Sequence, residues 1–131
     1  MFNILFIHLN KIVKQLIMEN ISILAQLVVS TSVIIVWVFR YENIVAEFKY
    51  YGLSTLVRNC VGASKIVLAT LLILGIWYPE FLIPSSLLMA SLMVGAQYCH
   101  MKVKNPLLKF IPSLVLLFLC VFIAVFKYGL L

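Results

Sequence analysis

The chain has 131 residues, of which 65% are hydrophobic and only 11% are charged. A soluble domain of this length needs more polar residues to cover its surface, so the composition excludes a soluble globular protein and predicts an integral membrane protein. The net charge of +6 suits contact with anionic lipid headgroups, and nucleic-acid binding is not needed to explain it.

Residues 1–20 have the periodicity of an amphipathic helix, with apolar side chains on one arc and polar side chains on the other. They have no basic start and no small-residue cleavage site, which argues against a signal peptide. We expect an interfacial helix that lies in the membrane surface and is joined directly to the first span. The alternative is that its apolar face packs on the bundle or on a partner subunit. The apolar arc comprises Phe2, Leu5, Phe6, Leu9, Ile12, Val13, Leu16 and Ile17, and the polar arc Asn3, His8, Asn10, Lys11, Lys14, Gln15 and Glu19.

Four continuous apolar stretches are long enough to cross a bilayer, which takes about 20 helical residues. They lack the alternating pattern of a lipid-facing β-strand. The sequence therefore predicts an all-α integral membrane four-helix bundle, formed by residues 21–131 as one domain. The predicted spans are residues 21–39, 57–77, 82–99 and 106–126.

The breaks between these spans carry helix-ending and helix-starting residues. Pro79 and Pro84 bracket the turn between the second and third spans. Asn105 is expected to cap the fourth helix, with Pro106 at its first position and Pro112 bending it one turn later. Residues 40–54, rich in aromatic and charged side chains, predict a short helix or turn at the membrane surface.

The distribution of basic residues predicts the orientation. We call the side that holds both termini side A, and the side that holds loops 40–56 and 100–105 side B. Because cytoplasmic loops are enriched in Lys and Arg, side B is expected to be cytoplasmic, in the inner membrane of a bacterium. Side B has six such residues, Arg40, Lys49, Arg58, Lys102, Lys104 and Lys109, and side A has three, Lys11, Lys14 and Lys127.

The second span carries a lysine far from either end. Arg58, Gly62, Lys65 and Ala69 fall at i, i+4, i+7 and i+11, so two cations and two small residues share one stripe. If Arg58 marks the interface, Lys65 lies about 10 Å deeper. Either Lys65 snorkels toward side B, or it faces the bundle interior with Arg58 and meets Glu42 or a ligand oxygen in a pocket open to side B.

The third span presents two stripes. The first brings Gln97 and His100 to side B, the same end as Arg58. We interpret its methionines as core residues and His100 as an interfacial hydrogen-bonding residue, because no second ligand lies at metal-binding spacing. The second stripe has the small-xxx-small spacing that permits close helix contact. The first stripe comprises Ser86, Met89, Met93, Gln97 and His100, and the second Ser91, Gly95 and Cys99.

No catalytic or metal-binding motif is legible. Cys60, Cys99 and Cys120 form no CxxC pair and no Cys/His zinc spacing, and we interpret them as small buried packing residues. A bridge between Cys60 and Cys99 is geometrically conceivable, but a cytoplasmic side B would keep it reduced. No Ser/His/Asp or paired-carboxylate arrangement points to hydrolysis. We therefore expect no catalytic residue and no metal.

Several stretches carry a family pattern: KYYGLS, then VRNCVGASK and LLILGIWYP at the ends of the second span, LLMASLMVGAQYCH on the third, and KVKNPLLKFIPSLVLL after it. On these stretches, the chain from about Trp37 to Phe126 resembles the DoxX-like family of small four-helix membrane proteins. Such proteins commonly carry a glutamate where this sequence has Lys65, so no role of that carboxylate can be carried over. A second departure is the segment 40–43, where relatives often have a glycine followed by a lysine; His100 does match.

The resemblance implies a compact bundle associated with quinol oxidase or thiosulfate-oxidising complexes, with other membrane oxidoreductase assemblies, or with chaperoning of membrane proteins. Our leading hypothesis is a non-catalytic accessory or assembly component. It would bind a quinone, the candidate cofactor, or a lipid headgroup near side B through Arg58, Lys65, Gln97, His100 and Glu42. Its expected partners are membrane lipids and either copies of itself or other membrane proteins, which it would contact through the helix-packing residues Gly62, Ala69, Ser91 and Gly95.

Two other functions stay open from the sequence. In a quinone-linked oxidoreductase subunit, Lys65 and Arg58 would stabilise a reduced quinone oxygen, with electrons supplied by a partner's cofactor. The other function is a small transporter of an anionic substrate drawn to Lys65. Cation export is disfavoured because it needs a carboxylate inside the membrane. The acids Glu19, Glu42, Glu47 and Glu80 all lie at ends or in loops.

Overall fold

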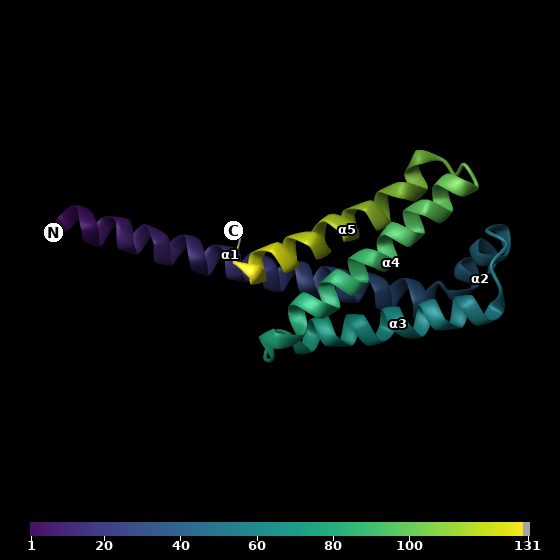
Figure 1. The fold of residues 1–131 in the computed structure, drawn as a ribbon, viewed down its shortest axis with the longest axis horizontal. Helices are drawn as coiled ribbons and strands as arrows, with labels where there is room; N and C mark the ends of the chain where they lie inside the picture. The colour runs from purple at the N-terminus through teal and green to yellow at the C-terminus, as the bar shows by residue number, and fades with distance from the viewer. Residues whose placement is uncertain (130–131) are drawn as a thin grey trace.

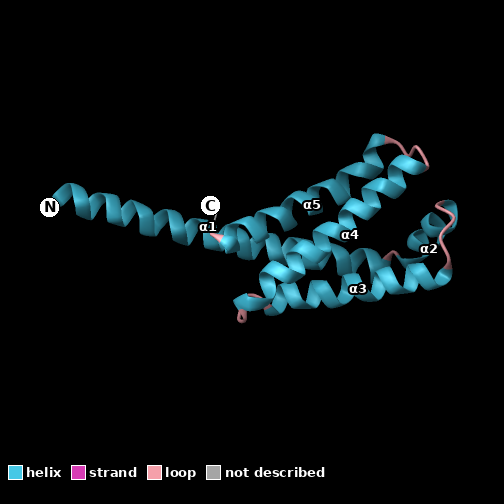
Figure 2. Ribbon diagram, in the orientation of Figure 1, coloured by secondary structure: helices cyan, strands magenta, loops and turns pink. Residues whose placement is uncertain are grey.

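The computed structural model describes residues 1–129 as helices joined by short turns, with no strand in that range (Figures 1 and 2). Four of its helical segments are long and apolar enough to span a membrane: Phe2–Phe39, Thr55–Leu74, Pro79–Lys102 and Leu107–Tyr128. The all-α membrane bundle predicted from the sequence is therefore confirmed. The elements are α1 (Phe2–Ile34), the π-helical turn η1 (Ile35–Phe39), α2 (Tyr41–Tyr50), α3 (Thr55–Leu74), the 3-10 turn η2 (Pro79–Phe81), α4 (Leu82–Lys102) and α5 (Leu107–Tyr128).

The bundle is formed by α3, α4, α5 and the second half of α1. Helix α1 packs against α3 and α5, while α4 packs against α3 and α5. The short helix α2 and the turn between α4 and α5 lie at one end of the bundle, and η2 and the end of α5 lie at the other (Figure 1). The loops that define side B therefore meet at one end of the molecule.

Buried polar side chains join α1 to α3. The Ser30 hydroxyl donates to the Ala69 carbonyl oxygen at 3.0 Å, and the Gln26 side-chain amide donates to the Leu72 carbonyl oxygen at 3.4 Å. Both donors are buried, and the Ala69 side chain is completely covered. Small and hydrogen-bonding residues let helices approach closely in lipid, where apolar burial gives no advantage over lipid contact. This seam fixes the position of α3 against α1.

The N-terminal half of α1 extends beyond the bundle (Figure 1). Residues 2–34 form one uninterrupted helix, with no break at residue 20 between the amphipathic segment and the first span. A helix of 33 residues is about 50 Å long and exceeds the roughly 30 Å hydrocarbon core. Large apolar side chains of this segment, such as Phe2, Phe6 and Leu9, are exposed. Its place in the membrane surface stays a prediction.

Several helix limits differ from the expected ones. Helix α3 begins at Thr55, two residues before the expected start, because the Ser54 hydroxyl accepts a hydrogen bond from the Val57 amide at 3.2 Å, and it ends at Leu74 rather than residue 77. Helix α4 continues to Lys102. Asn105 does not cap α5: Pro106 holds the cap position, and the helix continues through Pro112 to Tyr128.

Candidate ligand-binding cavity

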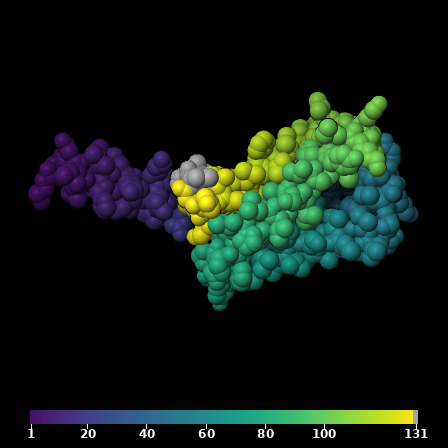
Figure 3. Space-filling view, viewed as in Figure 1, coloured from purple at the N-terminus to yellow at the C-terminus, as the bar shows by residue number. Residues whose placement is uncertain are grey.

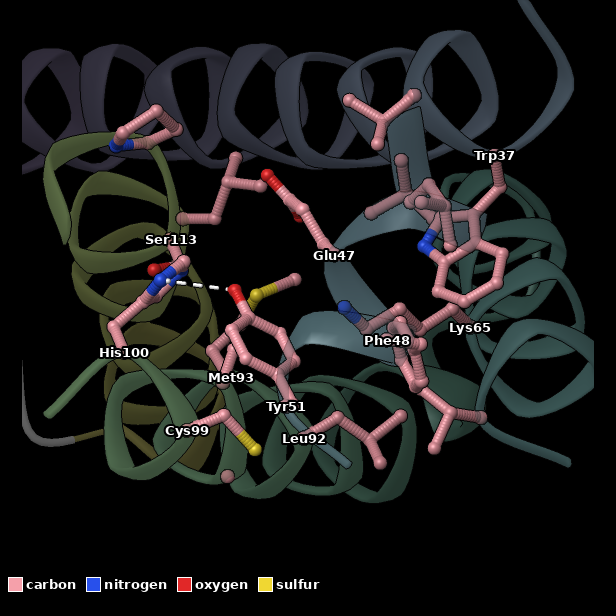
Figure 4. A pocket seen from close by; sticks show the side chains of 18 of the residues that line it. Trp37, Glu47, Phe48, Tyr51, Lys65, Leu92, Met93, Cys99, His100 and Ser113 are labelled. Atoms are coloured by element: carbon pink, nitrogen blue, oxygen red, sulfur yellow. Dashed lines mark hydrogen bonds between the residues drawn. The ribbon is translucent and has the colours of Figure 1, made fainter. Parts of the chain in front are cut away.

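A cavity of about 360 Å³ lies at the side B end of the bundle, between the end of α1, η1, α2, α3, α4 and α5. Ligand pockets commonly begin near this volume and combine apolar walls with a few polar groups. Its walls include the aromatic rings of Trp37 and Phe48 and the side chains of Leu92 and Met93. The polar groups that reach it come from Glu47, Tyr51, Lys65, Ser113 and His100 (Figure 4).

Lys65 is half-buried and extends from α3 into this cavity (Figure 4). Its Nζ lies 5.6 Å from the centroid of the Trp37 ring. Aromatic faces attract ammonium groups at such distances, which offsets part of the free energy of removing the charge from water. The ammonium therefore has three hydrogen-bond donors available beside an apolar chamber.

Glu47, on α2, lines the same cavity as Lys65. Glu42, the acidic residue expected from the sequence, is exposed and lies outside the cavity lining. The pattern Ile44, Glu47, Phe48 and Tyr51 follows the i, i+3, i+4, i+7 spacing of one helix face. Because Ile44 is buried and Phe48 packs on the core, this face points inward and brings Glu47 with it. That spacing is the sequence feature that could have identified Glu47.

Tyr51, His100 and Asn105 form a hydrogen-bonded cluster beside the cavity. The Tyr51 hydroxyl lies 3.1 Å from His100 Nδ1, as the dashed line in Figure 4 marks, and Asn105 Nδ2 lies 2.7 Å from the same nitrogen. Asn105 Nδ2 also approaches the Tyr51 hydroxyl, at 3.5 Å. Asn105 therefore ties the α4–α5 turn to the α2–α3 loop, which explains why it does not cap α5.

The phenol of Tyr51 has a raised pKa. Burial, and then the negative charge of Glu47, raise its pKa from 10.0 to about 12, while the hydrogen bond from Asn105 lowers it slightly. Both main causes disfavour the phenolate. Tyr51 therefore stays a neutral hydroxyl at any physiological pH, able both to donate and to accept.

Arg58 does not share the cavity with Lys65. Its guanidinium lies over the Tyr41 ring, 5.6 Å from the centroid, at a second and shallower cavity on the other side of Trp37. Trp37 lines both cavities and packs on Gly62, which lies between the two cations on their stripe. The expected joint placement of Arg58 and Lys65 is corrected for this reason, although they share a helix face. Within residues 1–129, Arg58 Nε is buried without a hydrogen-bond partner.

Gln97 lies behind the cavity wall rather than in the cavity. Its side-chain amide donates to Ser113 Oγ at 2.7 Å and to the Phe110 carbonyl oxygen at 3.0 Å, which joins α4 to α5. Of the five expected ligand-binding residues, the structure thus brings Lys65 and His100 to one cavity. It adds Glu47, Tyr51 and Trp37, which the sequence analysis did not select as site residues.

The four expected helix-packing residues divide into two pairs. Gly62 and Ala69 are buried inside the bundle, whereas Ser91 and Gly95 are exposed. Ser91 and Gly95 line the cavity, and a Cβ at Gly95 would meet no atom within 4 Å. Their contact with another subunit stays a prediction.

The three cysteines differ in their exposure to the surroundings. Cys120 is buried, Cys99 is half-buried and Cys60 is exposed, so the interpretation of all three as buried packing residues is wrong for Cys60. All three are free thiols. Across residues 1–129, no group of three or more His, Cys, Asp or Glu side chains is arranged to hold a metal ion.

Three comparisons with known proteins were informative to different degrees, and the family comparison alone gave a match. Neither a curated protein nor a solved structure matched this chain. The sequence profile of the DoxX-like family matches residues 21–123, which cover four-fifths of the chain, including the second and third spans in full and parts of the first and fourth. This match includes Lys65, Glu47 and the other residues that line the cavity. The chain therefore belongs to the DoxX-like family.

Proposed function

We propose that this protein is a non-catalytic accessory or assembly component of a membrane complex, and that it binds a quinone in the cavity at side B. The observation that carries the proposal is the cavity itself. It combines aromatic and aliphatic walls with Lys65, whose ammonium extends into it from within a membrane span. A charge so placed is retained when it meets a partner or a ligand.

The side chains of the cavity walls favour a ligand whose headgroup is a flat ring that carries oxygen acceptors. Lys65 can donate to a carbonyl oxygen, and the Tyr51 hydroxyl can donate to or accept from a second polar group. Trp37 and Phe48, whose rings lie edge to face at 5.8 Å, offer aromatic contact area. A quinone ring with a single apolar tail matches this combination.

The charge of Glu47 distinguishes neutral from anionic ligand headgroups. Its carboxylate faces the same chamber as Lys65, so the two formal charges balance. A free anion would be attracted by Lys65 and repelled by Glu47, whereas a neutral head avoids the repulsion. This balance favours a quinone over a phosphate-bearing headgroup and disfavours the transport of an anionic substrate.

A quinone-linked oxidoreductase subunit is the second candidate, because the Lys65 ammonium would stabilise negative charge on a reduced quinone oxygen. The partner would then supply the electron-carrying cofactor. The two functions differ in a measurable way: a redox subunit co-purifies with a flavin- or haem-bearing protein, and its quinone is reduced when that protein receives electrons.

The proposal includes an orientation. The excess of Lys and Arg at side B supports a cytoplasmic location for loops 40–56 and 100–105, and we propose a bacterial inner membrane. The ligand head would then lie nearer the cytoplasmic surface. A phosphatase that folds only outside the cytoplasm, fused after the last residue, is expected to be active; an inactive but expressed fusion would reverse the orientation.

The test of the proposed function is purification in mild detergent, followed by mass spectrometry of bound quinones, phospholipids and proteins. Native protein is compared with Lys65→Leu and with Lys102→Leu, a control that removes an exposed lysine outside the cavity. We expect a quinone that is retained by native protein and by the control, and lost from Lys65→Leu. A phospholipid lost in its place would identify the lipid-headgroup alternative. Equal retention in a folded Lys65→Leu protein would contradict the site.

A further inference from the structure

Helices α3 and α4 form a wedge. They meet at η2, where Gly75 packs on Leu82, and they separate toward side B (Figure 1). The space-filling view shows a hollow between their surfaces at the separated end (Figure 3). The residues that line the cavity from these two helices include Val57 and Val61 of α3 and Ser91 and Gly95 of α4.

The open side of the wedge lies within the membrane span. Val57, Ser91 and Gly95 are exposed even though they line the cavity, so the chamber opens to the outside between α3 and α4. Gly95 lies about 10 Å along α4 from its end at Lys102, inside the span Pro79–Lys102. In a bilayer that this span crosses, we expect lipid chains rather than water at this depth.

The rim of this opening is chemically suited to lipid. The Ser91 hydroxyl donates to the Leu87 carbonyl oxygen of its own helix at 3.0 Å, so its hydrogen is not presented to the hydrocarbon. A Cβ at Gly95 would meet nothing within 4 Å, so the glycine leaves free space at the rim. The charged groups that reach the chamber, those of Lys65 and Glu47, belong to its interior.

We infer that the opening between α3 and α4 is a lateral portal, through which a quinone passes from the bilayer into the cavity and in which its isoprenoid tail remains. The inference rests on the proposed function. The head would lie beside Lys65, Glu47 and Tyr51, and the tail would leave past Ser91 and Gly95. The small residues of this stripe then serve to keep a passage open, whereas the sequence analysis assigned them to contact with another helix.

Trp37 provides a reporter for this path. The chain has two tryptophans, and Trp77 is exposed in the turn after α3, at the end of the bundle opposite side B. In a Trp77→Phe background, Trp37 is the only tryptophan that selective excitation reports, and it lines the cavity. The probes are decyl-ubiquinone, whose ring quenches tryptophan, and the tail-less benzoquinone with the same head. Both are mixed rapidly with the protein in lipid vesicles.

Gly95→Leu fills the portal, and Val94→Leu is the matched control at an exposed neighbouring position outside the cavity lining. We expect Gly95→Leu to slow saturable quenching by decyl-ubiquinone at least about tenfold, to slow the tail-less probe less because that probe leaves no tail in the portal, and to leave the control unchanged. Sedimentation of each variant reports its oligomeric state.

The outcomes separate the portal from the proposed function. Native quenching rates in a folded Gly95→Leu protein would overturn the portal while leaving the quinone site intact. A changed oligomeric state with unchanged rates would return Ser91 and Gly95 to helix packing. If decyl-ubiquinone gives no saturable quenching of the native protein, or quenches Lys65→Leu equally well, the site itself fails and the portal fails with it.

Discussion

Trp37 packs on Gly62 so closely that no side chain fits between them. A Cβ built on Gly62 would stand 2.6 Å from Trp37 Cζ3 and 2.8 Å from Cε3. The indole therefore lies directly on the backbone of α3, with the Lys65 cavity on one side and the Arg58 cavity on the other. This contact determines which cation can reach the interior of the bundle.

The first prediction compares the stability of two variants in which a glycine is replaced by alanine. Gly62→Ala forces the Trp37 ring to move, and overpacking of this kind destabilises a protein by about 1–3 kcal/mol. Gly95→Ala meets no atom within 4 Å and is expected to cause no loss, or a gain of up to about 1 kcal/mol from helix propensity. Unfolding in mixed micelles measures both. Equal stability of the two variants would show that Trp37 does not pack on α3 as described.

The second prediction concerns the charges of Glu47 and Lys65, which face one cavity from different helices. If they interact, Lys65→Met should change the free energy of unfolding by a different amount in the Glu47→Gln background than in native protein. We expect a coupling energy of about 0.5 kcal/mol or more from this double-mutant cycle. Additive effects would mean that each charge is balanced separately, by solvent or lipid.

The third prediction is a pH dependence. The pKa of Tyr51 is about 12 in the folded protein against 10.0 for an ordinary tyrosine, so the unfolded chain releases this proton first. The stabilising effect of Tyr51 is complete below pH 10 and is lost as pH rises from 10 toward 12. Tyrosinate absorbance of native protein minus that of Tyr51→Phe isolates this titration.

A matched variant tests the cause of the shift. Glu47→Gln removes the negative charge but leaves the burial, which is the larger cause, so the pKa of Tyr51 should fall part of the way toward 10.0. A Tyr51 that titrates near the ordinary value in native protein would indicate that the phenol is open to water. An unchanged pKa in Glu47→Gln would place the carboxylate too far away to matter.

The fourth prediction concerns the seam between α1 and α3. Ser30→Ala removes the hydrogen bond to the Ala69 carbonyl and should lower the free energy of unfolding by about 0.6 kcal/mol, the usual value between membrane helices. Ala69→Leu should cost more, about 1–3 kcal/mol, because the Ala69 side chain is completely covered. If Ala69→Leu were tolerated without loss, the two helices would not pack here.

The spans were predictable because each is a continuous apolar run, and their number and order are confirmed. The ends were harder to place, since they depend on single contacts. The Ser54 cap moves the start of α3, and the side chain of Asn105, expected at the start of α5, bonds to His100 instead. Hydropathy does not distinguish a capping amide from one that joins two loops.

The candidate site was predictable only in part, because a stripe on one helix does not determine which side chains meet. Lys65 attracted attention as a charge within a span, and it does face a cavity. Its seven-residue spacing from Arg58 predicted a shared pocket, but Trp37, which comes from η1, the continuation of α1, packs on Gly62 between the two cations. Glu47 was not predicted because residues 40–54 were expected to lie on the membrane surface as a short helix or turn, and such a placement does not show which helix face points inward.

Equilibrium binding to the lone Trp37 tests the central claim most directly. In the Trp77→Phe background, decyl-ubiquinone is titrated in detergent into the native site, into Lys65→Leu and into Arg58→Leu. A site built around Lys65 predicts saturable quenching that weakens at least about tenfold in Lys65→Leu, or about 1.4 kcal/mol, and is unchanged in Arg58→Leu. Quenching that rises without saturation, or with equal affinity in Lys65→Leu, would contradict the claim that this cavity binds a quinone.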